Sequence, residues 1–472
     1  MSDAKSMLKG LAGFSIVPIT TAFITIFVIP VVSNVFPAEE YGKINLFYSV
    51  GTLLMAALTL GLDNSFIRYY FEPPRGLTCK SIQLIALAVG LLVTVFVTFV
   101  AVLFTPQAVS DYMFGECQPG LIVMLGLYVA SLILFRLLNT DARMQENVRR
   151  YNVQSIAQAF VTRVAFVFVA LFSTYYAYSI VAMSVGMLFL SLFFLVLQRD
   201  AFAFPEGKVT ASGIKMLFAF GVPVMMTNFV LHLNGMVGKL VMSGAGMYEA
   251  VGVFAIATTL SNVFTVIPSA FSAWWSPFMY RNYKTKQRTI AKVHDLVMLA
   301  SGLIVAFIII FQEVLFVIVG GEYATCQAYF MIIMLNPVQA LICETTSYGI
   351  VLEEKPKYNV LASAFGVTLS AVITLTLMKE MGVYAAALGV AASALAISVM
   401  RTVIGQRCYK TIEAPTKTLA CAALIVTACF LNTILCRSIA SEIAGGFALI
   451  AILVLMYRTQ IKEAVISLRR SS

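Results

Sequence analysis

Charged residues are scarce in this chain. Lys, Arg, Asp and Glu make up 11% of its 472 residues, whereas they make up about 25% of a soluble domain. Hydrophobic residues make up 60%, and they gather in nearly continuous runs that are long enough to cross a bilayer as helices. A membrane barrel would instead show short alternating segments. The sequence therefore predicts an all-α polytopic membrane protein.

Residue types that hold metals, nucleotides and reacting groups are also few. There are two histidines and eight cysteines, and the cysteines form no C-x-x-C pair, so neither a metal site nor a cofactor is expected. The phosphate-binding pattern G-x-x-x-x-G-K-S/T does not occur, and no loop is long enough for a soluble ATPase domain. Neither a Ser-His-Asp set nor a paired-carboxylate site appears, so the sequence does not favour an enzyme.

The apolar runs predict about fourteen transmembrane helices. Their expected ranges are 10–34, 43–70, 81–104, 119–142, 151–173, 177–197, 213–239, 249–277, 289–312, 326–350, 357–378, 382–404, 416–436 and 439–457. The last two, and the separation of the fifth from the sixth at Ser173–Tyr178, have the weakest sequence signals. An even number of spans places both chain ends on the same side of the membrane.

The basic residues predict which side that is. The chain has 32 Lys and Arg residues. Those in loops expected outside are Lys43, Lys239, Lys379 and Arg437. Those within spans are Arg68, Arg136, Arg163 and Arg401. The others fall in segments that would face the cytoplasm, as the positive-inside rule requires, so both termini are expected there. Attraction to anionic membrane lipids explains the net charge of +10 without a nucleic-acid partner.

A weak internal repeat recurs after about six spans. Met7–Thr20 is similar to Met216–Thr227, and each places a proline a few residues into a span. Each is followed by a span that begins near a glycine, in Tyr41–Asn45 and in Val251–Ala255. Duplicated halves are the usual plan of secondary transporters, with the site between the halves. Chance similarity between apolar segments is the alternative explanation.

Two arginines lie deep inside predicted spans. Arg136 interrupts the apolar run Leu121–Leu138, and Arg163 interrupts Ile156–Phe172. A guanidinium at that depth costs roughly 2.5–3.5 kcal/mol, so it normally faces a protein interior or a watery cavity. Arginine keeps its charge and presents a planar fork that matches phosphate. Both are therefore predicted to bind an anionic substrate.

A polar stripe continues from Arg136 along the same span. Arg136, Asn139, Thr140 and Arg143 fall at i, i+3, i+4 and i+7, so they share one helix face. Arg143, at the inner boundary, is either an anchor in the inner leaflet or a substrate contact. Asn139 and Arg143 are included among the predicted substrate-binding residues.

The end of the second span carries two more charges. Asp63 either pairs with Arg136 or Arg68 and neutralises it, or titrates or exchanges partners during transport. Arg68 is a further predicted substrate contact.

The second half of the chain adds three candidates. In the seventh span, Asn228, His232, Gly235 and Lys239 are expected to share one face. His232 is either a packing residue or a proton sensor, and Lys239 is either an anion contact on the exit side or an interface anchor. Glu344 either offsets an arginine or binds a coupling cation.

Seven local motifs, in order over about 350 residues, together resemble one known family. They are Pro37–Gly42 (PAEEYG), Leu60–Tyr70 (LGLDNSFIRYY), Gly221–Pro223 (GVP), Ala273–Pro277 (AWWSP), Gly320–Tyr323 (GGEY), Glu354–Asn359 (EKPKYN) and Met381–Ala387 (MGVYAAA). The chain resembles a bacterial polysaccharide-transport flippase of the multidrug/oligosaccharidyl-lipid/polysaccharide superfamily. One departure is Gly238-Lys239, where members often have an acidic residue or an Asp-basic pair, so a coupling-ion role there is doubtful.

The resemblance implies a fold and a function. It implies a V-shaped alternating-access bundle with an N-terminal lobe at 1–208, a C-terminal lobe at 209–410, and two extra helices with a tail at 411–472. It implies a flippase of the bacterial cytoplasmic membrane that moves an undecaprenyl-diphosphate-linked oligosaccharide to the outer leaflet for cell-surface polysaccharide synthesis. A polymerase or glycosyltransferases are the partners implied.

Two other functions compete with this one. The first is an ion-coupled drug/cation antiporter of the same superfamily. Its pocket should be acidic and aromatic, whereas the interior expected here leans basic, with Arg136 and Arg163 against Asp63 and Glu344, and with Arg68 and Lys239 near the span ends. The second is a non-transporting scaffold for envelope assembly, which has no need of buried charges on several helices.

Overall fold

The computed structural model describes residues 2–202, 204, 210–353, 355, 357–435 and 438–462, with side chains from residue 16 onward and none at Leu435. Two compact units divide the chain at Ala255 and Ile256. The expected lobe boundary at 208/209 falls outside the described residues, as do Lys208, Arg437 and the end of the predicted tail. The division into lobes at 1–208, 209–410 and 411–472 stays a prediction.

Unit 1 consists of helices, and α12 crosses its end. The elements are α1 (Ser2–Val35), α2 (Ala38–Leu58), α3 (Leu62–Arg68), α4 (Cys79–Phe104), α5 (Pro106–Phe114), α6 (Pro119–Met144), α7 (Val148–Phe160), the π-helical turn η1 (Val161–Ala165), α8 (Phe166–Val169), α9 (Tyr176–Leu197), the 3₁₀ turn η2 (Arg199–Ala201), α10 (Ala211–Asn234), α11 (Val237–Gly244) and α12 (Tyr248–Val263).

Unit 2 is helical too, and no strand occurs among the residues that the structure describes. Its elements are α13 (Val266–Asn282), α14 (Gln287–Val319), the 3₁₀ turn η3 (Gly321–Cys326), α15 (Gln327–Thr346), α16 (Tyr348–Leu352), α17 (Lys357–Met381), α18 (Val383–Cys408), α19 (Pro415–Leu435) and α20 (Ile439–Met456).

The helices confirm the predicted all-α membrane fold. Within the described ranges, 13 segments are long and apolar enough to cross a membrane, or 14 if the bent pair α2 and α3 is one span. The three weakest predictions are confirmed, because α19 and α20 form and the chain between α8 and α9 breaks at residues 170–175. The protein is therefore a multi-pass membrane protein.

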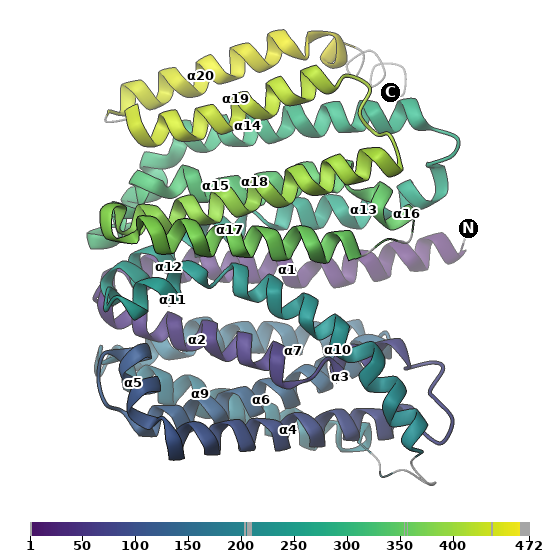
Figure 1. Cartoon of the computed structure of the whole chain (residues 1–472), viewed down its shortest axis with the longest axis vertical. Helices are drawn as coiled ribbons and strands as arrows, with labels where there is room; N and C mark the ends of the chain where they lie inside the picture. Colours follow the sequence, from purple (N-terminus) through teal and green to yellow (C-terminus); the bar gives the residue numbers. More distant parts are fainter. Residues whose placement is uncertain are drawn as a thin grey trace. The chain divides into compact units, whose positions relative to one another are not determined.

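One helix is central to each unit. In unit 1, α6 packs against α2, α4, α7 and α9, and Figure 1 shows α4, α6 and α9 running alongside one another. In unit 2, α15 packs against α13, α14, α18 and α19. Both central helices bury most of their side chains, because neighbouring helices cover each of them on several sides.

The second predicted span is broken in the structure. Between α2 and α3 the axis bends by 58° at Leu60 and Gly61, whose φ angles are 49° and 72°. A positive φ is costly for any residue but glycine, and here the backbone of Gly61 also lies against Gly221 of α10, where a Cβ would collide. Ser65 then donates a hydrogen bond to the Leu217 carbonyl at 2.7 Å. The bend therefore positions α3 directly on α10.

A second glycine contact lies at the other end of α2. A Cβ on Gly42 would overlap the carbonyl oxygen of Tyr248, and a Cβ on Gly252 would overlap that of Ala38. Each glycine thus packs against the carbonyl group of the residue that lies four positions, or about one helical turn, before the other glycine. These are the two glycines that the predicted internal repeat aligns, although the repeat itself stays a prediction. Small residues at such crossings let two helices approach closely in a membrane.

This contact predicts the effect of one methyl group. Gly42→Ala should lower the apparent Tm of the detergent-solubilised protein, corresponding to about 1–3 kcal/mol, because the overlapping atom is rigid backbone. Gly120→Ala is the matched control: its Cβ would meet nothing within 4 Å, and helix propensity favours alanine by up to about 1 kcal/mol. Equal Tm values for the two variants would show that α2 and α12 do not approach this closely.

Candidate functional site

Arg136 of α6 and Asp63 of α3 form an ion pair in unit 1. Nε of Arg136 lies 3.4 Å from Oδ2 of Asp63, and the two side chains are 44% and 10% exposed. Asn64 donates a hydrogen bond to the other carboxylate oxygen at 2.9 Å. The structure thus shows the predicted pairing of Asp63 with Arg136. The arginine remains the more accessible partner, although it sits within a membrane span.

His232 lies near this pair. It is exposed on α10, close enough to Arg136 for their charges to interact. The predicted shared face with Lys239 is wrong, because α10 ends at Asn234 and α11 starts only at Val237. The turn in which Met236 bonds to the Leu233 carbonyl breaks the helical periodicity between the two residues.

Lys239 is held inside unit 1 instead of at an interface. Its side chain is almost fully buried, and its ammonium donates hydrogen bonds to Oδ1 of Asn45 at 2.7 Å and to Oγ of Ser49 at 3.1 Å. Both acceptors lie on α2 and are neutral. In this structure, therefore, Lys239 ties α11 to α2, and its role as an anion contact on the exit side or as an interface anchor stays a prediction.

Arg163 lies in the π-helical turn η1 and reaches α1. Its Nη1 donates to the Thr21 carbonyl at 3.1 Å and to the hydroxyl of Thr25. A π-helical turn carries one extra residue, and such turns occur frequently at functional sites. Here the turn directs the guanidinium to α1, so Arg163 fastens that helix in the conformation described.

The other basic candidates have different surroundings. Asn139 does not point into open space: its amide donates to Tyr151, Gln154 and Ser155, and so joins α6 to α7. Arg143 and Arg68 are exposed, and the Arg68 guanidinium lies 5.5 Å from the centre of the Tyr69 ring. A substrate-binding role for all these residues stays a prediction.

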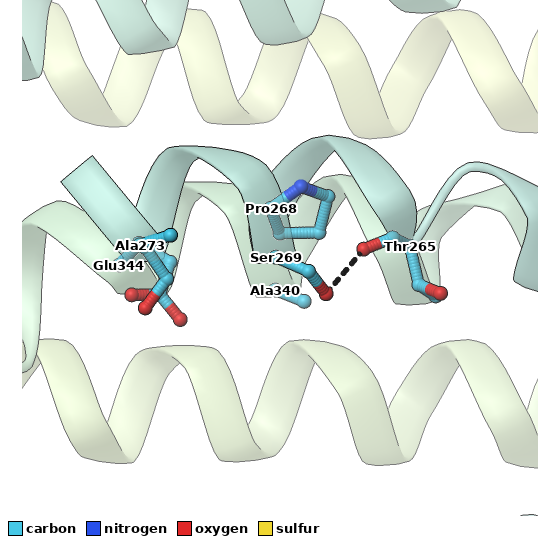
Figure 2. Close-up of a pocket in the computed structure, with 7 residues that line it drawn as sticks. Thr265, Pro268, Ser269, Ala273, Ala340 and Glu344 are labelled. Carbon is cyan, nitrogen blue, oxygen red and sulfur yellow. Dashed lines mark hydrogen bonds between the residues drawn. The ribbon is translucent and has the colours of Figure 1, made fainter. Parts of the chain in front are cut away.

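Glu344 lies in unit 2, on α15, where it lines a cavity together with α13 (Figure 2). Its carboxylate shares this cavity with Ser272, and the charge of Arg401 acts on it only from farther away. Among the described residues, it forms no ion pair within 4.0 Å. The predicted offset of an arginine is therefore only long-range.

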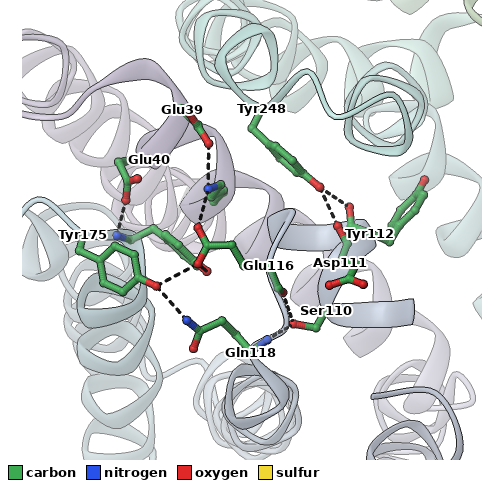
Figure 3. A network of polar contacts seen from close by, with 11 residues as sticks. Glu39, Glu40, Ser110, Asp111, Tyr112, Glu116, Gln118, Tyr175 and Tyr248 are labelled. Carbon is green, nitrogen blue, oxygen red and sulfur yellow. Dashed lines mark hydrogen bonds and ion pairs between the residues drawn. The ribbon is translucent and has the colours of Figure 1, made fainter. Parts of the chain in front are cut away.

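A polar network in unit 1 was not predicted as functional (Figure 3). Lys43, almost fully buried, lies 2.9 Å from Oε1 of Glu39 and 3.4 Å from Oε1 of Glu116. The rings of Tyr176 and Tyr248 face its ammonium at 4.9 and 5.4 Å, distances at which a cation and an aromatic face attract. The sequence signal for this network is the PAEEYG motif, which indicates the family resemblance but does not by itself predict the network.

Further members of the network fix the helix ends around it. Glu40 accepts a hydrogen bond from the Tyr176 backbone N–H at 2.6 Å. Tyr175 donates to Glu116 at 3.2 Å and accepts from Gln118 at 2.9 Å. The start of α2, the start of α9 and the loop before α6 are thereby joined. No group of three or more possible metal ligands occurs among the described residues.

Glu116 should make the stability of this network depend on pH. Partial burial opposes its ionisation, but the charge of Lys43 and hydrogen bonds from Tyr175, Lys43 and Gln118 outweigh burial and lower the pKa of Glu116 below its ordinary 4.5. A group with a lowered folded pKa stabilises the fold above its unfolded pKa, and that stabilisation is lost as the pH falls through the folded value.

Thermal unfolding between pH 7 and pH 3 tests this. The apparent Tm of the parent should fall more steeply below about pH 4.5 than that of Glu116→Gln, which has no proton to take up at this position. Glu72→Gln, at an exposed position between α3 and α4, is the control and should follow the parent. If Glu116→Gln and the parent lose stability in parallel, the network does not depend on ionised Glu116.

Solved structures share this fold. Lipid II flippase MurJ, in an inward closed conformation, aligns with a TM-score of 0.70 at 12% identity, over 95% of this chain and 99% of MurJ. An inward-facing multidrug resistance MATE family transporter of the MOP superfamily aligns with a TM-score of 0.55 at 14% identity, over 87% and 99%. The MATE multidrug transporter DinF-BH aligns with a TM-score of 0.59 at 15% identity, over 84% and 95%.

The sequence comparison defines the family. A search of the curated proteins found no match. Residues 7–283 match the family model described as polysaccharide biosynthesis protein, which is more than half of the chain. The likeness in structure, at its low identity, shows the fold. The chain therefore belongs to the polysaccharide biosynthesis protein family.

Proposed function

We propose that this protein is a flippase that moves an undecaprenyl-diphosphate-linked oligosaccharide from the inner to the outer leaflet of the bacterial cytoplasmic membrane. The family and the fold support lipid-linked transport in general. The anionic diphosphate, the direction of transfer, the cytoplasmic termini, and a polymerase or glycosyltransferase as partner are parts of the proposal. The protein acts as a transporter and not as an enzyme.

The main support for the proposal is the accessibility of the Arg136 guanidinium. Its guanidinium is 44% exposed and contacts Asp63 through Nε, so the two terminal amino groups are available to a ligand. Two parallel N–H groups are the geometry that binds phosphate bidentately. A cation at this depth raises the free energy of membrane insertion, and binding of an anionic ligand would give that charge a function.

Asp63 gives the site a way to release its ligand. When the site is empty, the carboxylate compensates the arginine. A diphosphate competes for the same guanidinium, and Asp63 can return to it when the lipid leaves. His232 of α10, near enough for its charge to interact with that of Arg136, is a further nitrogen donor in this part of unit 1. Arg68 and Arg143, both exposed, are further cations for the lipid head group.

The membrane potential supplies a driving force for export. Moving one negative charge outward across an inside-negative potential of about 100 mV releases about 2.3 kcal/mol. A doubly charged head group gains twice as much, so transfer needs no nucleotide. Ion coupling through Asp63, His232 or Glu344 is the alternative source of energy.

Transfer in liposomes tests the function. Fluorescent undecaprenyl-diphosphate glycan is placed in vesicles that contain the purified protein, and its accessibility on each leaflet is followed with and without an imposed potential. Arg136→Gln should slow the initial rate about tenfold or more, since a hydrogen bond to a charged group contributes about 1.5–3 kcal/mol. Transfer by the parent should accelerate when the potential favours movement of the anion.

Two controls separate binding from folding. Arg136→Gln combined with Asp63→Asn leaves no unpaired buried carboxylate, so it should fold well and still transfer slowly. Arg149→Gln removes an exposed arginine and should behave like the parent. Normal transfer by the double variant would remove Arg136 from the mechanism, and no transfer by a folded parent would contradict the flippase proposal.

A further inference from the structure

A cavity of about 450 Å³ lies within unit 2, outside the arginine site. The residues that line it, contributed by α13, its N-terminal flank and α15, are Thr265, Pro268, Ser269, Ser272, Ala273, Ala340 and Glu344. Figure 2 shows Thr265, Ser269 and Glu344 along it, with the Ser269 hydroxyl bonded to the Thr265 carbonyl at 2.8 Å. Ser269 and Ala273 are exposed, so the cavity is open and is not a packed helix interface.

The hydroxyl groups recur along α13 in a regular pattern. Thr265, Ser269, Ser272, Ser276 and Tyr280 are separated by four, three, four and four residues, which places them on one helix face. At 1.5 Å per residue, this face is about 22 Å long. On the opposite side of α13, the indole of Trp274 is 55% exposed. The hydroxyl face is therefore distinct from the apolar, lipid-type surface of the same helix.

Helix α15 supplies the acidic side of the cavity. Glu344 lines the cavity opposite Ser272 of α13, and Tyr348 begins the next helix, α16. The rings of Tyr280 and Tyr348 meet edge to face at 6.2 Å, and Tyr280 is 51% exposed. The cavity thus combines hydroxyl groups with one carboxylate, and the exposed ring of Tyr280 lies farther along the same face of α13.

These groups match the chemistry of a carbohydrate. A sugar hydroxyl both donates and accepts hydrogen bonds, as serine and threonine hydroxyls do, while a carboxylate only accepts. A hydroxyl that bonds to its own helix carbonyl is satisfied when the cavity is empty, yet its oxygen keeps lone pairs for a ligand. The carboxylate repels phosphate, so the cavity does not suit the diphosphate itself.

We propose that the hydroxyl face of α13, together with Glu344, binds the sugar part of the lipid-linked substrate; this inference rests on the flippase function proposed above. An alkali cation is the competing ligand for Glu344. A cation needs several oxygen atoms that converge on one point, whereas the hydroxyls here are spread along the helix. An extended polyhydroxylated ligand fits this distribution better.

Binding to two lipids tests the inference with the full-length protein in detergent. The probes are undecaprenyl diphosphate and the same lipid carrying a hexose trisaccharide. The parent should bind the glycosylated lipid more tightly. Glu344→Gln and Ser272→Ala should each reduce this preference, Glu344→Gln by about tenfold, with unchanged affinity for the lipid without sugar. Thr368→Ala is the control, because this exposed hydroxyl of α17 bonds only to its own helix.

The outcomes distinguish the inference from the function beneath it. Arg136→Gln should weaken binding of both lipids equally, and a parent that binds neither lipid would contradict the flippase proposal. A parent that binds both lipids with equal affinity, or a Glu344→Gln variant that keeps the full preference, would overturn the sugar site alone. If Glu344→Gln instead removes a dependence of binding on Na⁺ or pH and keeps the preference for sugar, Glu344 is a cation ligand and the inference is wrong.

Discussion

A charge in the hydrocarbon layer must be compensated by the protein itself, and unit 1 meets this constraint in one consistent way. Arg136 and Arg163, which lie inside spans, and the buried Lys239 of α11 all find their acceptors on α1, α2 or α3. The acceptors differ in strength. Asp63 carries a full charge, whereas Arg163 and Lys239 bond to neutral oxygens, namely a carbonyl, an amide and hydroxyls. Because polar groups satisfied in this way fix helix positions, α1, α2 and α3 are oriented as much by cations on later helices as by apolar packing.

The sequence predicted what depends on composition and missed what depends on backbone geometry. The membrane spans follow from apolar runs, and the pairing of Asp63 with Arg136 follows from the cost of an isolated charge. The breaks after Leu58 and Asn234 do not follow from hydropathy, because they arise from local turns inside apolar segments. Lys239 was therefore placed on the wrong helix. Tryptophan is typical of membrane–water interfaces, but Trp275 is fully buried, while its neighbour Trp274 is exposed.

The polar network around Lys43 shows a further limit. Its members come from four separate stretches of sequence: residues 39–43, residues 110–118, the turn at Tyr175-Tyr176, and Tyr248 at the start of α12. No single stretch has a pattern that requires the others. The PAEEYG motif and the glycine at its end become intelligible only when Gly42 is seen against Tyr248 and Gly252. The sequence thus shows the motif, but only the structure shows which residues the motif contacts.

The π-helical turn at Val161–Ala165 has a mechanical consequence. It contains one residue more than an α-helical turn, and one residue in a helix corresponds to a rotation of about 100° and a rise of about 1.5 Å. The extra residue therefore rotates and shifts α8 relative to α7 by one residue. Arg163 lies in this turn, so its hydrogen bonds to α1 help to keep the extra residue at this position in the helix. Any rearrangement that moved the turn would rotate the flanking segment by a whole residue and not by a small elastic amount.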